Sequence, residues 1–181
     1  DALGDPTARL AGRLTLSPIP HIDPLGSIIL PAIMLLGSGG AFAFGWAKPV
    51  PYNPYNLRNF RVGTILVAVA GVTANFCIAI VFGLMIRYHD ALGLVLGTPF
   101  VSMLGTIVFL NIILGVCNLI PFPPLDGSKV LFALLPVRYQ YIQQYLESNW
   151  ILFVVFVMFF ASYLIAPAST FVFKLITGFS S

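Results

Sequence analysis

Charged residues are scarce in this 181-residue chain. Lysine, arginine, aspartate and glutamate make up 8% of it, whereas 59% of the residues are hydrophobic and the mean hydropathy is +0.96. Soluble domains carry about 25% charged residues, so the composition excludes an ordinary soluble domain and predicts an integral membrane protein. The net charge of +3 is too small and too scattered for a nucleic-acid-binding surface.

Cysteine, histidine and glutamate are also rare. Cys77 and Cys117 both lie in apolar runs, where cysteine behaves as a small hydrophobic residue and says nothing about the redox compartment. His21 and His89 stand 68 positions apart, and Glu147 is the single glutamate. The sequence contains no internal repeat and no low-complexity linker, so we expect one membrane domain over residues 1–181.

Long apolar runs predict the membrane-spanning elements. A helix needs about 20 apolar residues to cross the hydrocarbon, and three segments satisfy this: Val62–Ile86, Pro99–Ile120 and Trp150–Leu175. We expect a bend at Pro167 in the third. A fourth run, Leu25–Trp46, is interrupted by Pro31 and by a Gly-Ser-Gly-Gly stretch, so its length suits a re-entrant or half-spanning segment. The predicted fold class is therefore an all-α polytopic membrane protein.

The placement of basic residues favours the re-entrant alternative for Leu25–Trp46. If this run does not cross, seven basic residues share one face of the membrane and two lie on the other, which is a clear positive-inside bias. If it crosses, the count is five against four. The larger group contains Arg9, Arg13, Lys48, Arg58, Arg61, Lys129 and Arg138, and the smaller contains Arg87 and Lys174.

Two of the predicted spans carry small and polar residues on one helical face. Gly71 and Asn75 stand four apart in the first, and Asn111, Gly115 and Asn118 stand at i, i+4 and i+7 in the second. Such faces either pack helices closely or hold a site, because unpaired polar groups are costly in hydrocarbon. We expect the two helices to pack together, with Asn118 near the end of their contact.

The segment directly after Asn118 reads L-I-P-F-P-P-L-D-G. Pro121, Pro123 and Pro124 remove three backbone donors and forbid a regular helix, so the chain should run extended before Asp126 and Gly127. Broken backbone at membrane depth is tolerated where protein or a water-filled cavity satisfies it. A carboxylate delivered there is either a functional group or the N-cap of a short helix that ends near Pro136.

These residues identify a resemblance to the site-2 protease family of intramembrane zinc metalloproteases, in its compact prokaryotic form. N-L-I-P-F-P-P-L-D-G at 118–127 is similar to the family motif N-x-x-P-x-P-x-x-D-G, and G-V-T-A-N at 71–75 is similar to G-x-x-x-N. Further similar stretches are G-D-P-T-A-R at 4–9, G-R-L-T-L-S-P at 12–18, H-I-D-P-L-G at 21–26 and F-G-W-A-K-P-V-P-Y-N at 44–53. The resemblance covers residues 1 to about 135.

The resemblance implies a zinc cofactor and a peptide or membrane-protein substrate within the lipid bilayer. Asp126 would be the third zinc ligand, and Asn118 would steady the substrate backbone or the tetrahedral intermediate. In the family, H-E-x-x-H supplies two histidine ligands and the glutamate that activates water. This chain contains no such motif. The resemblance places that helix upstream of Asp1, so we expect the chain to be part of a longer protease in a prokaryotic plasma membrane.

Residues 45–56 alternate apolar and polar residues with prolines, as edge strands do. From this pattern we hypothesise that the small β-like edge segment accepts an extended substrate by strand addition, using Trp46, Pro49, Pro51 and Asn53. Its aromatic residues equally suit an interfacial anchor. Two other functions stay open: an inactive relative that acts as a membrane adaptor or chaperone, and a transporter, which broken helices also indicate.

Overall fold

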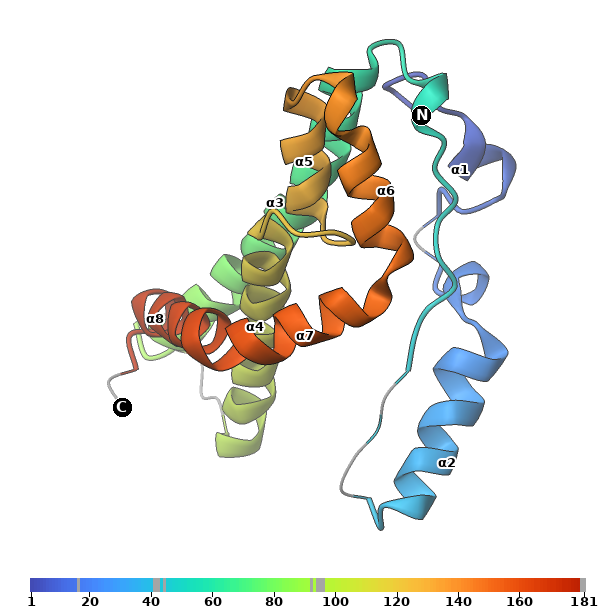
Figure 1. The fold of residues 1–181 in the computed structure, drawn as a ribbon. Helices are drawn as coiled ribbons and strands as arrows, with labels where there is room; N and C mark the ends of the chain where they lie inside the picture. The colour runs from blue at the N-terminus through green and yellow to red at the C-terminus, as the bar shows by residue number, and fades with distance from the viewer. Residues whose placement is uncertain (16, 41–42, 44, 92, 94–96, 180–181) are drawn as a thin grey trace. The chain divides into compact units, whose positions relative to one another are not determined.

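The computed structural model describes residues 1–15, 17–40, 43, 45–91, 93 and 97–179 (Figure 1). The chain divides into two compact units, Asp1–Gly63 and Thr64–Ser181. Because nothing defines how the two units sit relative to one another, each is described by itself.

The first unit consists of short helical pieces joined by irregular backbone. They are α1 (Thr7–Leu10), η1 (Ile19–His21), η2 (Pro24–Ile29), α2 (Leu30–Gly37) and η3 (Pro54–Asn56). The π-helical η2 leads directly into α2, and together they form an apolar helix over Pro24–Gly37. This length is short of a full crossing and suits the predicted half-spanning segment. Whether Leu25–Trp46 crosses the membrane stays a prediction, and residues 41–42 and 44 of that run lie outside the described part.

The second unit is built on two long apolar helices. These are α3 (Phe60–Arg87), whose first turn belongs to the first unit, and α4 (Thr98–Leu119), and they confirm the first two predicted spans as continuous helices. Shorter helices follow: α5 (Asp126–Leu134), η4 (Val137–Tyr139), α6 (Gln140–Ser148), α7 (Trp150–Phe160), η5 (Ala161–Ile165) and α8 (Ala166–Thr177).

The third predicted span, Trp150–Leu175, is not one continuous helix, and its regular pattern is interrupted just before Pro167, where the sequence predicts a bend. It is divided into α7, the π-helical η5 and α8, which follow a bent path in Figure 1. Pro167 occupies the first turn of α8 and has no N–H to donate one turn back, so the regular α-helical pattern is interrupted just before it. Within the described residues, two helices rather than three are long and apolar enough to cross a membrane.

The predicted β-like edge segment does not form a strand, and the described part of the chain contains helices and irregular backbone without strands. Residues 45–53 are irregular, but the Trp46 N–H donates to the Gly26 carbonyl at 3.0 Å and the Lys48 N–H donates to the His21 carbonyl at 2.9 Å. Pro49 and Pro51 lack the N–H groups that a continuous ladder requires, which explains the absence of a regular strand.

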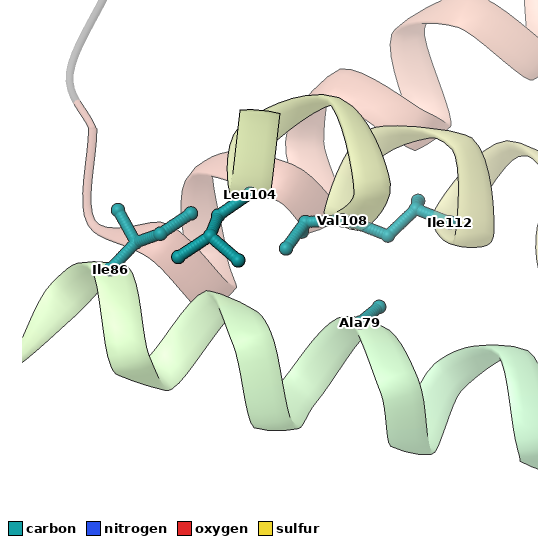
Figure 2. Packing of buried hydrophobic residues seen from close by; sticks show 5 residues of the cluster. All are labelled: Ala79, Ile86, Leu104, Val108 and Ile112. Carbon is teal, nitrogen blue, oxygen red and sulfur yellow. The ribbon is translucent and has the colours of Figure 1, made fainter. Parts of the chain in front are cut away.

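The core of the second unit lies where α3, α4 and α8 meet. Leu104, Val108 and Ile112 repeat every four residues along α4 and contact Ala79 and Ile86 of α3, as Figure 2 shows. Partly buried residues of α8 complete this cluster, namely Val172, Phe173 and Ile176.

Small residues bring these helices together. A methyl group added at Gly115 of α4 would lie 2.9 Å from the ring of Phe76 on α3, and a methyl group at Gly83 of α3 would collide with Ile176 of α8. The expected packing of the two spans is therefore confirmed. Asn111 has a structural role, because its Nδ2 donates a hydrogen bond to the Ile107 carbonyl of its own helix at 2.8 Å.

Candidate metal centre

The proline-rich segment turns the chain from the end of α4 into α5. Ile120 and Leu125 are extended, with ψ of 128° and 155°, and two turn hydrogen bonds lie between them. The Phe122 N–H donates to the Ile120 carbonyl at 2.8 Å, and the Leu125 N–H donates to the Phe122 carbonyl at 3.0 Å. The helix break after Asn118 is thus confirmed, although the backbone makes tight turns rather than one extended run.

Gly127 allows α5 to begin directly against the end of α4. A methyl group at Gly127 would lie 2.5 Å from the Ile120 carbonyl oxygen and 2.6 Å from the Leu119 carbonyl oxygen. These are backbone atoms and cannot move aside as the end of a flexible side chain does. The approach that places Asp126 beside α4 therefore requires glycine at the next position.

Asp126 is the first residue of α5 and does not cap it. The N-cap position belongs to Leu125, and no side-chain cap bond is formed there. The Asp126 carboxylate instead accepts a hydrogen bond from Lys129, whose Nζ lies 2.8 Å from Oδ1. The predicted short helix ending near Pro136 is therefore confirmed, but Asp126 is its first residue and not its N-cap. Among the described residues, Lys129 is the one that donates to the carboxylate.

A cavity of about 190 Å³ lies beside Asp126 within the second unit. As far as the described residues show, its lining is apolar except for the side chains of Asp126 and Asn118, which come from α5 and from the last turn of α4. The remaining lining residues are Ala68, Val69 and Val72 of α3, Leu119, Gly127 and Val130. The amide and the carboxylate that sequence analysis singled out thus share one cavity.

Gly71 of α3 lies next to the second carboxylate oxygen. A methyl group at Gly71 would be 3.5 Å from Oδ2 of Asp126, which is the contact that this position makes with a described residue outside its own helix. Gly71 stands eleven residues after Phe60, the first residue of α3, or about 17 Å along the helix axis. The carboxylate is therefore held deep along a helix long enough to cross the hydrocarbon.

Asn75 is not part of this group. It is half-buried on α3, does not line the cavity, and makes no side-chain hydrogen bond to another described residue. The structure therefore brings together Gly71, Asn118, Asp126 and Gly127, and it leaves Asn75 outside the cavity.

Among the described residues that line this cavity, Asp126 is the one side chain suited to bind a zinc ion. The other ligands that zinc needs are not found among the described residues. Asp126 offers a carboxylate oxygen, which is one of the ligand types that zinc binds. The described part of the chain holds no group of three histidine, cysteine, aspartate or glutamate side chains suited to a metal.

The two histidines have other surroundings. His89 follows the end of α3, which is 16 residues beyond Gly71, or about 24 Å along the helix axis. Its ring contacts the Ile86 carbonyl at 2.8 Å and Asp90 at 3.2 Å. His21 belongs to the first unit, where its Nε2 lies 3.3 Å from the Thr15 carbonyl.

The four predicted substrate-binding residues lie in the first unit. Trp46 packs over Gly26, where any side chain would collide with the indole, and the Trp46 carbonyl accepts a hydrogen bond from Ser27 Oγ at 2.8 Å. Asn53 is the N-cap of η3, and its Oδ1 accepts from the Tyr55 N–H at 3.1 Å. Pro49 and Pro51 lie in the irregular backbone between them.

Sequence analysis overlooked Asp5, which holds the end of this segment. The Asp5 carboxylate is buried and accepts from the Thr7 N–H and hydroxyl, from the Asn53 N–H at 2.8 Å and from Asn56 Nδ2 at 3.0 Å. The Thr7 hydroxyl bond above all holds the pKa of Asp5 far below its usual range. The Asp-Pro-Thr pattern signals the local turn, whereas the partners 48 and 51 positions away leave no sequence signal.

Lys129 was also overlooked as a partner of Asp126. Its spacing of three positions from an acid at the start of a helix is a recognisable ion-pair signal. Sequence analysis counted Lys129 among the charges of one membrane face, but the structure pairs it with a carboxylate beside Gly71.

Taken together, these features define a class: a helical membrane protein with a carboxylate and an amide in an apolar cavity beside a long apolar helix. The model of peptidase family M50 matches residues 85–161. The chain is 36% identical over 171 residues to a Bacillus subtilis protein named "Putative zinc metalloprotease YwhC", covering 91% of this chain and 74% of that protein. It therefore belongs to peptidase family M50, the site-2 protease family of membrane-embedded zinc metalloproteases.

A more distant relative is the "Zinc metalloprotease MJ0392" of Methanocaldococcus jannaschii. It is 34% identical over 83 residues, which cover 46% of this chain and 23% of the relative. No solved structure matches the chain.

Proposed function

We propose that the chain is part of an intramembrane zinc metalloprotease that cleaves peptide bonds of membrane-embedded substrates. One observation carries the proposal: among the described residues that line the apolar cavity, the two with polar side chains are Asp126 and Asn118. Hydrocarbon penalises both groups, so their meeting there favours a functional site over incidental placement.

Each of the two side chains has a distinct role in this proposal. Asp126 would hold the zinc ion through its carboxylate, and Asn118 would donate an amide N–H to the carbonyl oxygen of the substrate. Asn118 makes no side-chain hydrogen bond to another described residue, so its amide is available for that task. Zinc, when bound, polarises a carbonyl and lowers the pKa of water toward about 7. The apolar lining keeps the rest of the site dry.

The remaining zinc ligands and the general base would come from an H-E-x-x-H helix of the same protein, upstream of Asp1. Catalytic zinc sites use three protein ligands and keep one position for water, whereas the described residues supply a single carboxylate at this cavity. By this proposal the 181 residues alone are inactive, and the protein resides in a prokaryotic plasma membrane.

We further propose that residues 45–53 hold the substrate in extended form by hydrogen bonding along its backbone. The N–H groups of Trp46 and Lys48 are used within the first unit, and Pro49 and Pro51 have none. The segment therefore offers mainly carbonyl acceptors to a substrate strand. An interfacial anchor made by Trp46, Tyr52 and Tyr55 is compatible with that role.

The first prediction tests Asp126 in the full-length protein. Asp126→Ala should abolish zinc-dependent cleavage of a reporter substrate in proteoliposomes and leave membrane insertion intact, because the substitution removes a ligand and no apolar surface. Asp90→Ala is the matched control, since that carboxylate is 93% exposed at the far end of α3. Full activity in Asp126→Ala would remove Asp126 from the metal site and the proposal with it.

An inactive relative that serves as a membrane adaptor or chaperone is the second candidate. The ion pair of Asp126 with Lys129 favours it, because that pair satisfies the carboxylate without a metal. Elemental analysis separates the two functions: the protease proposal expects one zinc per full-length protein and none per 181-residue chain. An absence of zinc from both, with metal supplied during purification, would favour the adaptor.

A further inference from the structure

A second pocket lies within the first unit, around the loop between α1 and η1. Its volume is about 390 Å³, and the described residues that line it are Arg13, Leu14, Thr15 and His21. This volume falls in the range of about 300–1,000 Å³ that is typical of small-molecule sites. The loop therefore places a guanidinium, a hydroxyl and an imidazole around one space.

Hydrogen bonds within the loop hold these side chains in place. Arg13 Nη1 donates to the Pro20 carbonyl, and the Arg13 N–H donates to the Ala8 carbonyl at 2.8 Å. The ring of His21 lies against the Thr15 carbonyl, with Nε2 at 3.3 Å. Arg13 and His21 are each half-buried, so the pocket is built by the fold of the loop and not by freely moving side chains.

The pocket offers hydrogen-bond donors that no described residue uses. A guanidinium has five N–H donors, and the Pro20 carbonyl takes one of those that belong to Arg13. The Thr15 hydroxyl accepts from the Ser17 N–H at 3.1 Å, and its own proton goes to no described residue. Both side chains can therefore donate to the oxygens of a ligand.

The charge of Arg13 has no carboxylate partner among the described residues. The first unit contains three acids, and each has other contacts. Asp1 lies 3.4 Å from Arg9, whereas Asp5 and Asp23 accept hydrogen bonds from backbone groups and uncharged side chains. A half-buried cation without a partner favours an anionic ligand, and the planar guanidinium is the group best suited to phosphate.

Large apolar side chains surround the pocket along the chain. Leu14 lines the pocket and is 65% exposed, and Ile19, two positions before His21, is 75% exposed. The apolar helix Pro24–Gly37 begins three positions after His21. At a membrane interface, apolar side chains of this kind reach the acyl chains while a basic group stays at the level of the lipid headgroups. These surroundings favour a lipid phosphate over a soluble one.

We propose that this pocket binds the phosphate group of an anionic membrane lipid. Arg13 supplies the charge and N–H donors, Thr15 donates its hydroxyl, and Leu14 contacts the lipid next to its headgroup. A bound lipid fixes the loop at headgroup depth, directly before the apolar helix that begins at Pro24. The site uses residues of the first unit alone, so its existence does not depend on the proposed function.

The test measures lipid binding to the full-length protein in detergent by native mass spectrometry, with phosphatidylglycerol as the anionic probe. Arg13→Gln should weaken this binding by about tenfold or more, because hydrogen bonds to a charged phosphate are lost. Glutamine keeps an N–H donor for the Pro20 carbonyl, so the loop should stay intact. Phosphatidylcholine should bind more weakly than phosphatidylglycerol, because its choline group brings a second cation beside Arg13.

Two further variants make the result specific. Arg9→Gln removes the same charge from the same unit, but Arg9 is 63% exposed and lies beside Asp1, so binding should change by about twofold or less. Thr15→Val keeps the size of the side chain and removes the hydroxyl, which should weaken binding by about threefold. Thr15→Val replaces Arg13→Gln as the decisive variant if the latter does not fold.

Three outcomes would overturn the proposal. Equal losses in Arg9→Gln and Arg13→Gln would show a general attraction of basic residues to anionic lipid. Unchanged binding in Arg13→Gln, or in Thr15→Val where the first variant does not fold, would exclude the pocket. Displacement of the lipid by millimolar inorganic phosphate would assign the pocket to a soluble phosphate instead.

Discussion

At the scale of single residues, Gly71 and Gly127 both lie beside Asp126 but have different surroundings. A methyl group at Gly127 would press on two backbone carbonyl oxygens at 2.5 and 2.6 Å, whereas at Gly71 it would make an ordinary contact of 3.5 Å with a carboxylate oxygen. The first position forbids any side chain. The second tolerates a small one and excludes a large one from the neighbourhood of Oδ2.

This difference predicts opposite effects of the same substitution, glycine to alanine, at the two positions. Gly127→Ala should destabilise the protein by about 1–3 kcal/mol, because the turn between α4 and α5 must shift. Gly71→Ala should be neutral or slightly stabilising, because alanine favours a helix over glycine by up to about 1 kcal/mol. Thermal unfolding in detergent measures both, and equal effects of the two substitutions would contradict this account of Gly127.

At the scale of elements, the contact of α3 with α4 and α8 supports the helix that carries Asn118. Ile112 is fully buried at this contact, whereas Leu110, two residues earlier on α4, is 53% exposed. Close packing of this kind is the main source of helix association in a bilayer, since lipid is as apolar as the side chains themselves.

Ile112→Ala should therefore lower stability by about 2 kcal/mol or more through the cavity that it leaves. Leu110→Ala removes a side chain of similar size from an exposed position and should change stability by about 0.5 kcal/mol or less. Denaturant unfolding in mixed micelles gives both values. A larger loss in Leu110→Ala would mean that this face of α4 is covered in the folded protein.

The elements also show where the sequence was an incomplete guide. The pattern of apolar residues predicted α3 and α4 because each is one uninterrupted run. It counted Trp150–Leu175 as one span with a bend at Pro167, whereas the structure divides this segment into α7, η5 and α8. It also predicted a strand at 45–56, although the prolines remove the donors that a strand needs.

At the scale of the whole molecule, α3 connects two groups of basic residues at its ends. Arg61 lies in its first turn and Arg87 in its last, and Arg87 Nη1 donates to the Leu175 carbonyl at 2.8 Å, beside Lys174. Arg87 and Lys174, the two basic residues predicted for the less basic side of the membrane, therefore lie at the same end of α3. Lys129, which was counted with Arg61 on the more basic side, pairs with Asp126.

This arrangement predicts the orientation of the chain. In a variant without Cys77 and Cys117, a cysteine at Asp90 should react with a membrane-impermeant thiol reagent in intact cells, and a cysteine at Arg61 should react only after lysis. The physical reason is the excess of basic residues on the cytoplasmic side. Labelling of both positions in intact cells would show that α3 does not cross.

The sequence by itself determined features that depend on a few neighbouring residues, and the tertiary structure decided those that depend on contacts between distant segments. Scarcity of charge, two uninterrupted apolar runs and three prolines before Asp126 determined a membrane protein, two long helices and a broken backbone that presents a carboxylate, because composition and backbone sterics act over a few residues. Only the tertiary structure placed Gly71 beside Oδ2, put Asn118 and Asp126 in one cavity, and tied Asp5 to Asn53 and Asn56. Those contacts depend on how separate elements pack, which no short stretch of sequence specifies.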